Sequence, residues 1–568
     1  MAFGWARRYL RCYAGCCVLA AAILVGTPTT GHAEPSGLPH ADDELVIGVP
    51  EAITALHPLV PTLYEAFALG FAHRRLAMPD QSWHLTCALC TVLPSLANGR
   101  VKLVPAPGGG QGAEVTYTLQ PLARWADGEP VTSQDVVFSA EIEQMPDSGL
   151  NNALLFRNLR SVRVVDAKNF VMIFDHVQSG FNAPDAFQIL PEHIEGPIYR
   201  GLADKRDYLK HSAYRTMPTT PGLWMGPYRL AEFGAGKYAV FERNPYWFGE
   251  VPYFRKITLR FYPSSAQAQA GLFAGETDFL QEGTLPLSVA ADIRSRLQDS
   301  FQVKTAPGAT LLNVVVNLDQ PQLKDERVRH ALLLAIDRKT MAAELLGDEK
   351  AVAHSFLPPQ DPAYSDRVPH VPFDPAAAAQ DLRDAGYHQS ESGRWVDAAG
   401  VPLALRLSIN AGNSLTGPVG DRLTAAWRRL GIDVTLVSDP ALLAQTLPHR
   451  RFDLALFSLT PTPEYVPQTI LSSAAIPTEA NNYSGQNFAG LRNSEIDGLL
   501  VALTGETDSR KRKELWTKLE LAWAQELPAL PLFDLPQLYV VPNWLRGFAP
   551  TGHLIPSSNF AETWSRRP

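Results

Sequence analysis

The sequence predicts a mixed α/β fold (α+β) made of more than one domain. Residues 224–279 contain closely spaced segments of strand character, such as "KYAVFERN" and "ITLRFYP". Between 313 and 459, strand and helix patterns alternate, which favours an α/β unit with some parallel strand pairing. The chain has 568 residues, 46% hydrophobic and 19% charged. A globular chain of that length is expected to form roughly two to four domains, whose cores need no disulfides.

The N-terminus has the three-part pattern of a secretory signal peptide. Three Arg lie within residues 7–11, an apolar run covers 18–25, and the small residues Gly31 and Ala33 suit cleavage before Glu34. The apolar run is too short for a membrane-spanning helix. We therefore predict that residues 1–33 are removed and that the mature chain is exported.

The predicted mature chain is acidic. Removal of residues 1–33 takes away three Arg and no acidic residue, so the formal net charge changes from −8 to −11. An acidic surface argues against nucleic acid as a partner. Cys16 and Cys17 precede most of the apolar run, and this position disfavours a lipid-anchored cysteine.

Cys87 and Cys90 form a Cys-x-x-Cys pair. In an exported protein, a disulfide is the first interpretation of such a pair, and idle thiols are compatible with the same pattern. A thioredoxin-like redox site is expected beside a βαβ pattern. A zinc site needs two more ligands, and His84 is the only His nearby. We predict a disulfide and no metal site.

The first mature strand is expected at Glu44–Val49 ("ELVIGV"). Residues 98–113 are typical of a loop, and their glycine cluster lacks the Lys-Ser/Thr of a phosphate-binding loop. A half-exposed strand is expected at 116–120, where apolar and polar residues alternate.

The acidic residues of "WADGEPVTSQDVV" have structural explanations. Asp127 begins a turn that contains Gly and Pro. Thr132 precedes Asp135 by three residues, which resembles a capping box at the start of a helix. Turn and cap are therefore the favoured roles of Asp127 and Asp135, and acid/base catalysis is the alternative.

The remaining elements follow from capping and periodicity. Ser264 or Ser265 is expected to cap a short helix that ends at Gly275, and Lys324–Leu346 is expected to be one helix with Asp325 near its start. The other expected elements are strands at 313–318, 403–409, 432–437 and 452–459, and helices at 376–385, 415–430, 495–503 and 509–526, before a return segment after Leu530.

Several motifs, in this order, resemble solute-binding protein family 5, the periplasmic oligopeptide- and dipeptide-binding proteins of ABC importers. The family's aromatic-x-Asp-Gly-x-Pro turn and the helix after it match Trp125 to Val136. "GPYRL" (226–230), "ERNPYWFGEVPYFRKITLRF" (242–261) and "NLDQPQLKDERVRHALLLAIDR" (317–338) match later family elements. The resemblance covers most of residues 44–540.

The resemblance implies a two-lobed periplasmic-binding-protein type II fold. It has a hinge, an extra subdomain in the first lobe, and a ligand enclosed between the lobes. The implied domains are 1–33 signal peptide, 34–70 lobe I part a, 71–221 extra subdomain of lobe I, 222–311 lobe I part b, 312–528 lobe II, and 529–568 return to lobe I.

The resemblance also points to a ligand-binding loop after the strand at 452–459. Peptide-binding members carry Trp-x-x-Asp there, and the Asp pairs with the peptide α-ammonium group. Here Leu459 takes the Trp position and Thr462 lies near the Asp position. We expect ligand contacts from Thr460, Thr462, Glu464 and Tyr465. The alternative for Glu464 is a solvated loop acid, so a small solute other than a peptide stays open.

The implied function is non-enzymatic. The chain would capture a peptide or peptide-like small solute without a cofactor and deliver it, as a monomer, to an inner-membrane ABC permease. The alternatives are a secreted hydrolase that uses acids such as Asp127 or Glu464, and a periplasmic thiol–disulfide protein that uses Cys87 and Cys90. The sequence leaves the identity of the solute, its affinity and the permease open.

Overall fold

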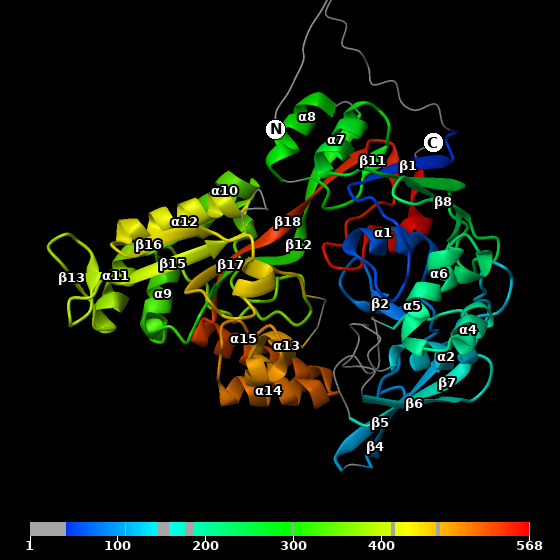
Figure 1. The fold of residues 1–568 in the computed structure, drawn as a ribbon, viewed down its shortest axis with the longest axis horizontal. Coiled ribbons are helices and arrows are strands. Elements are labelled where there is room, and N and C mark those ends of the chain that lie inside the picture. The colour runs from blue at the N-terminus through cyan, green and yellow to red at the C-terminus, as the bar shows by residue number, and fades with distance from the viewer. Residues whose placement is uncertain are drawn as a thin grey trace, which may run out of the picture. The chain divides into compact units, whose positions relative to one another are not determined.

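The computed structural model describes residues 41–107, 109–145, 158–176, 187–285, 287–297, 300–410, 415–461 and 466–566. Three of the expected ligand-binding residues, Thr462, Glu464 and Tyr465, lie outside these ranges, as does the predicted signal peptide. Three larger β-sheets with their helices form the framework (Figure 1).

The first sheet has five strands in the order β11 (Phe279–Leu280), β1 (Glu44–Val49), β10 (Lys256–Phe261), β9 (Tyr238–Arg243) and β8 (Tyr228–Gly234). β1 is parallel to β10 and β11, and the other pairs are antiparallel. The predicted strand at the start of the mature chain is confirmed. The helices α1 (Leu63–Ala72) and α7 (Ser265–Phe273) contact this sheet. Ser264 caps α7 by accepting the Gln267 N–H, as predicted.

The second sheet is antiparallel, in the order β4 (Val101–Pro105), β5 (Gln111–Thr118), β7 (Asn169–Phe174) and β6 (Leu159–Val164). The prediction of a loop over 98–113 is therefore wrong, because this segment contains β4 and the start of β5. Gly109 and Gly110 of the glycine cluster lie between the two strands, whereas Gly112 is part of β5. Gly109 and Gly110 have φ of +88° and +83°, which is backbone geometry that residues with a Cβ rarely adopt.

The helix α2 (Ser133–Glu143) begins with the predicted capping box. Thr132 and Asp135 each accept a backbone N–H of the other, and the Asp135 carboxylate also accepts the Glu192 N–H at 2.8 Å. Asp127 accepts the Glu129 N–H at 3.1 Å within the turn. Both acids therefore have the turn and cap contacts expected of structural residues.

The third sheet has the order β16 (Asp433–Ser438), β15 (Ala404–Ile409), β17 (Leu454–Leu459), β12 (Phe301–Val316) and β18 (Ala529–Pro542). β15 is parallel to β16 and to β17, so the predicted parallel pairing is confirmed. β12 is longer than the expected strand at 313–318, and it runs beside β18 over most of its length (Figure 1).

β12 and β18 take part in two hydrophobic cores. Leu538 and Val540 of β18 pack in one cluster with Tyr262 and Leu280, next to the first sheet. The later part of β12 belongs instead to the core of the third sheet. Between these parts, the register of the β12–β18 pair shifts between Ala306 and Thr310.

The segment predicted as one helix over Lys324–Leu346 forms two helices, α9 (Glu326–Leu334) and α10 (Arg338–Leu346), so that prediction is wrong. Asp337 explains the break, because its side chain accepts the Thr340 N–H at 3.1 Å and so caps a new helix. Asp325 caps α9 by accepting the Arg327 N–H.

The other helices match the expected positions closely: α11 (Pro375–Asp384), α12 (Thr416–Leu430), α14 (Ser494–Gly505) and α15 (Ser509–Glu526). Gly386 and Gly431 follow α11 and α12 with positive φ, as expected of residues just past a helix end. The short elements are β2 (Ala77–Pro79), β3 (Leu85–Cys87), α4 (Glu192–Gly201), α5 (Tyr208–His211), α6 (Ala213–Thr216), α8 (Ala290–Leu297), β13 (His388–Gln389), β14 (Trp395–Val396), α13 (Gln468–Leu471), β19 (Leu545–Arg546) and β20 (Ser565–Arg566).

A disulfide joins Cys87, at the end of β3, to Cys90, with 5.0 Å between their Cα atoms.

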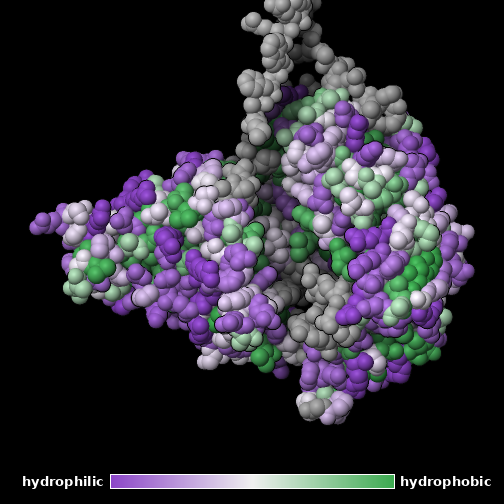
Figure 2. All heavy atoms as spheres, in the orientation of Figure 1, coloured by the Kyte–Doolittle hydropathy of each residue, from purple (hydrophilic) through white to green (hydrophobic). Residues whose placement is uncertain are grey.

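On the face shown in Figure 2, hydrophilic residues cover most of the surface and hydrophobic residues lie in smaller groups. Among the described residues, no helix has both the length and the apolar character needed to cross a membrane.

Candidate functional site

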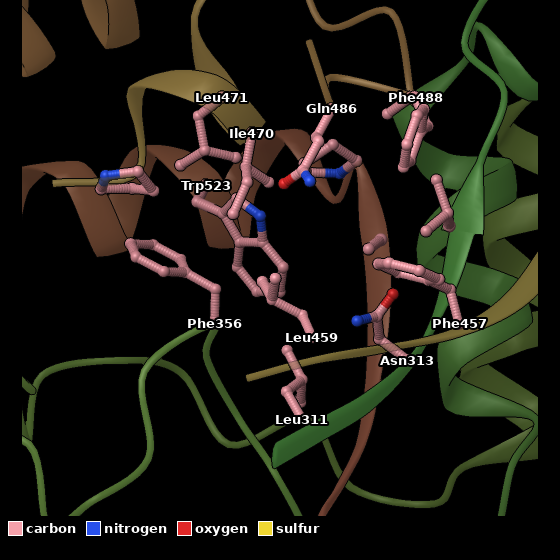
Figure 3. Close-up of a pocket in the computed structure, with 15 residues that line it drawn as sticks. Leu311, Asn313, Phe356, Phe457, Leu459, Ile470, Leu471, Gln486, Phe488 and Trp523 are labelled. Atoms are coloured by element: carbon pink, nitrogen blue, oxygen red, sulfur yellow. The ribbon is translucent and has the colours of Figure 1, made fainter. Parts of the chain in front are cut away.

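A cavity of about 60 Å³ lies against one face of the third sheet (Figure 3). The sheet contributes side chains from β12 and β17. The other lining residues come from Phe356, the segment around α13, residues 486–489, the helix α15 and the start of β18. The lining residues are Leu311, Asn313, Val315, Phe356, Phe457, Leu459, Pro467, Ile470, Leu471, Gln486, Phe488, Ala489, Trp523, Pro528 and Ala529.

The strand period places these side chains. Leu311, Asn313 and Val315 alternate along β12 and therefore share one face. The residues between them, such as Val314, pack into the core on the opposite face. Leu459 of β17 pairs directly with Leu311, so the two side chains lie side by side on the cavity face.

Asn313 gives this apolar cavity a polar group. Its side chain is 4% exposed, and its Oδ1 is buried without a hydrogen-bond partner among the described residues. Figure 3 shows the amide among the side chains of Phe457, Leu459 and Leu311. An unpaired buried acceptor is costly, so this oxygen is suited to accept an N–H or O–H group from a molecule in the cavity.

Of the four residues expected to bind ligand, Thr460 is the one that the structure describes. Its Oγ1 lies 2.9 Å from Thr310 Oγ1, and the two residues adjoin the Leu459–Leu311 pair. Leu459 itself lines the cavity. The predicted ligand-binding segment therefore begins at this cavity.

Two buried carboxyl groups lie near the cavity residues. Asp534 of β18 pairs with Leu311 and so shares its sheet face, and burial raises the pKa of Asp534 well above its usual range. Glu520 precedes Trp523 by one helical turn on α15 and accepts the Ser355 hydroxyl at 2.7 Å. Burial raises the pKa of Glu520 to about 8. Glu520 therefore favours the neutral acid at pH 7.

A second concentration of unpaired polar atoms lies after β11 and near the C-terminus. Buried oxygens of Gln281, Thr284 and Ser558 have no hydrogen-bond partner among the described residues. Glu282 accepts the Ser557 N–H at 2.8 Å, and burial raises the pKa of Glu282 to about 7. These groups are suited to hydrogen bonding with water or a polar solute.

Within the described ranges, no group of three or more His, Cys, Asp or Glu side chains is placed to hold a metal ion. Asp127 lies in its turn, 2.9 Å from His193 Nε2, and Glu464 is outside the described residues.

Most of the cavity lining was not predicted from the sequence. Phe356, Gln486 and Trp523 come from segments far apart in the chain, and no local pattern links them. Asn313 carried a usable signal, because it is an amide at the start of the apolar run "NVVVNL". A buried polar side chain on a central strand needs a hydrogen-bond partner, and none of the expected elements offered one to Asn313. The amide could therefore have marked a binding position.

Comparison with known proteins gives a family match over residues 110–482, to bacterial extracellular solute-binding proteins, family 5 Middle. The chain is 24% identical over 434 residues to the oligopeptide-binding protein AppA of Bacillus subtilis (strain 168), covering 75% of this chain and 76% of that protein. It is 23% identical over 511 residues to the nickel-binding periplasmic protein of Escherichia coli (strain K12), covering 88% and 90%.

A similar solved structure is that of the ABC transporter substrate-binding protein CtaP of Listeria monocytogenes. The TM-score is 0.74 at 19% identity, over 92% of this chain and 99% of that one. This likeness confirms the predicted fold class, a mixed α/β protein of the two-lobed periplasmic-binding type.

Proposed function

Because the chain belongs to the bacterial extracellular solute-binding proteins of family 5, we propose that it is the solute-capturing component of an ABC importer. The family consists of binding proteins, so the prediction of a non-enzymatic function is confirmed. The hydrolase and thiol–disulfide alternatives have no support from the family.

The solute that we propose is a peptide or a peptide-like small molecule. The observation that carries this proposal is the family match. A cavity at the end of β17, where the expected ligand-binding loop begins, supports it. Thr460, Thr462, Glu464 and Tyr465 are the proposed ligand contacts. The name of the Bacillus relative, an oligopeptide-binding protein, supports a peptide as the solute. The Escherichia relative is named as a nickel-binding protein, so the experiment must distinguish a peptide from a metal or its chelate.

The solute lies between two lobes with the boundaries given above. β12 and β18 are the proposed hinge, because each takes part in both hydrophobic cores and their pairing is irregular between Ala306 and Thr310. A solute that contacts both lobes stabilises the closed arrangement by its higher affinity for that arrangement.

Residues 1–33 direct export to the periplasm and are removed near Ala33. The mature monomer then presents its solute to an inner-membrane ABC permease. The pattern of charged, apolar and small residues supports the export step.

Native mass spectrometry of the protein purified from the periplasm tests both steps. We expect a polypeptide that begins near Glu34 and carries a bound peptide-like solute. A mass that begins at Cys16 or Cys17 with acyl chains would contradict the export proposal. A bound metal chelate would replace the peptide proposal, and a protein that binds no solute from periplasmic extract would contradict the function.

A further inference from the structure

The cavity beside β12 and β17 has a lining that restricts what it can hold. All lining residues are apolar except Asn313 and Gln486, and none is charged. Moving a charged group into such surroundings costs far more than one hydrogen bond returns. Apolar groups are therefore favoured as occupants.

Asn313 adds a requirement for hydrogen bonding. More than nine-tenths of this side chain is buried, and its Oδ1 has no partner in the described parts of the chain. A purely apolar occupant would leave the oxygen unpaired. An occupant with one N–H or O–H group satisfies it.

The volume limits the size of the occupant. The cavity measures about 60 Å³, whereas an engineered apolar cavity of about 150 Å³ holds benzene. A short aliphatic group therefore fits better than an aromatic ring.

We propose that this cavity is a specificity subsite for a short aliphatic group that carries a neutral hydroxyl or amide donor, which Asn313 Oδ1 accepts. The proposal rests on the proposed function, because the group belongs to the captured solute. Leu459, at the end of β17, connects the subsite to the expected ligand-binding loop.

Three small probes test the chemistry by ligand-observed NMR titration. These are ethanol, fluoroethane, which has a similar shape without the O–H, and ethylammonium. We expect the alcohol to bind about tenfold more tightly than the fluoride, the scale of an unpaired buried acceptor, and more tightly than the ammonium. Equal binding of alcohol and fluoride, or preference for the ammonium, would overturn the proposal.

Variants locate the binding. Asn313→Leu is expected to bring the ratio of alcohol to fluoride affinity to about one, because the acceptor is removed. Leu459→Trp is expected to fill the cavity and abolish binding of both probes, and Leu459→Phe serves if the larger ring prevents folding. Leu122→Trp is the control, because Leu122 is 70% exposed. Unchanged probe binding in the folded Leu459 variants would contradict the location.

Native mass spectrometry separates this inference from the proposed function. If wild type and the folded Leu459→Trp variant carry the same solute at the same occupancy, the subsite is wrong and solute capture stands. If the wild type takes up no solute from periplasmic extract, the function fails whatever the probes show.

Discussion

Glu520 links a single buried carboxyl group to the stability of the whole protein. Its side chain is fully buried, and its folded-state pKa is about 8 against an ordinary value of 4.5. Between these pH values the unfolded chain loses the proton while the folded chain keeps it, so stability falls as pH rises. We expect Glu520→Gln to remove this fall. In the wild type, the loss of unfolding free energy between pH 4.5 and pH 7 that is due to Glu520 is on the order of 3 kcal/mol.

Urea unfolding of both proteins from pH 4.5 to pH 8 measures this difference. Exposed Glu514 lies on the same helix and gives the control, Glu514→Gln, which is expected to keep the wild-type pH dependence. Parallel pH profiles of wild type and Glu520→Gln would show that the carboxyl titrates alike in both states.

We propose Glu464 as the residue that recognises a cationic group of the solute. If its carboxylate contacts such a group, Glu464→Gln weakens binding by about 1.5–3 kcal/mol, the range for a hydrogen bond to a charged group. Titration calorimetry with the solute recovered from the wild type measures the loss, and exposed Glu391→Gln is the control. Affinities that stay equal in Glu464→Gln and Tyr465→Ala would remove this loop from the site.

The loop from Cys87 to Cys90 is the clearest test of an element's contribution. Its disulfide closes a very short loop, so its effect on unfolded-chain entropy is expected below the roughly 3 kcal/mol of a 15-residue loop. We predict that the Cys87→Ser/Cys90→Ser variant keeps solute binding and loses only modest stability in urea. The double Ala variant controls for the hydroxyl placed at Cys90, which is fully buried. Loss of solute binding in both variants would assign this element to the site.

Short motifs predicted the features whose hydrogen bonds form between residues close together in the sequence. The capping box of Thr132 and Asp135, and the cap at Ser264, are each complete within a few residues of sequence. The break at Asp337 was missed because the apolar period continues across it. An Asp at this position can either lie inside a helix or cap a new one, and here it caps α10.

Elements and sites that depend on distant partners were not predictable in the same way. The length of β12 follows from its pairing with β18, more than 200 residues later in the chain. The cavity likewise joins Asn313, Phe356 and Trp523 through packing, whereas Leu459 was found because it ends a recognisable strand.

At the scale of the whole molecule, we propose that the chain captures a solute by closing two lobes around it. The irregular part of the β12–β18 pair is the proposed hinge, and solute binding is expected to favour the closed arrangement over the open one.

Small-angle X-ray scattering of the mature protein, with its solute removed and then restored to saturation, tests this claim directly. We predict a smaller radius of gyration at saturation, with full recovery of the larger value when the solute is removed again. A radius of gyration that stays the same while calorimetry shows saturation would contradict closure of the lobes around the solute.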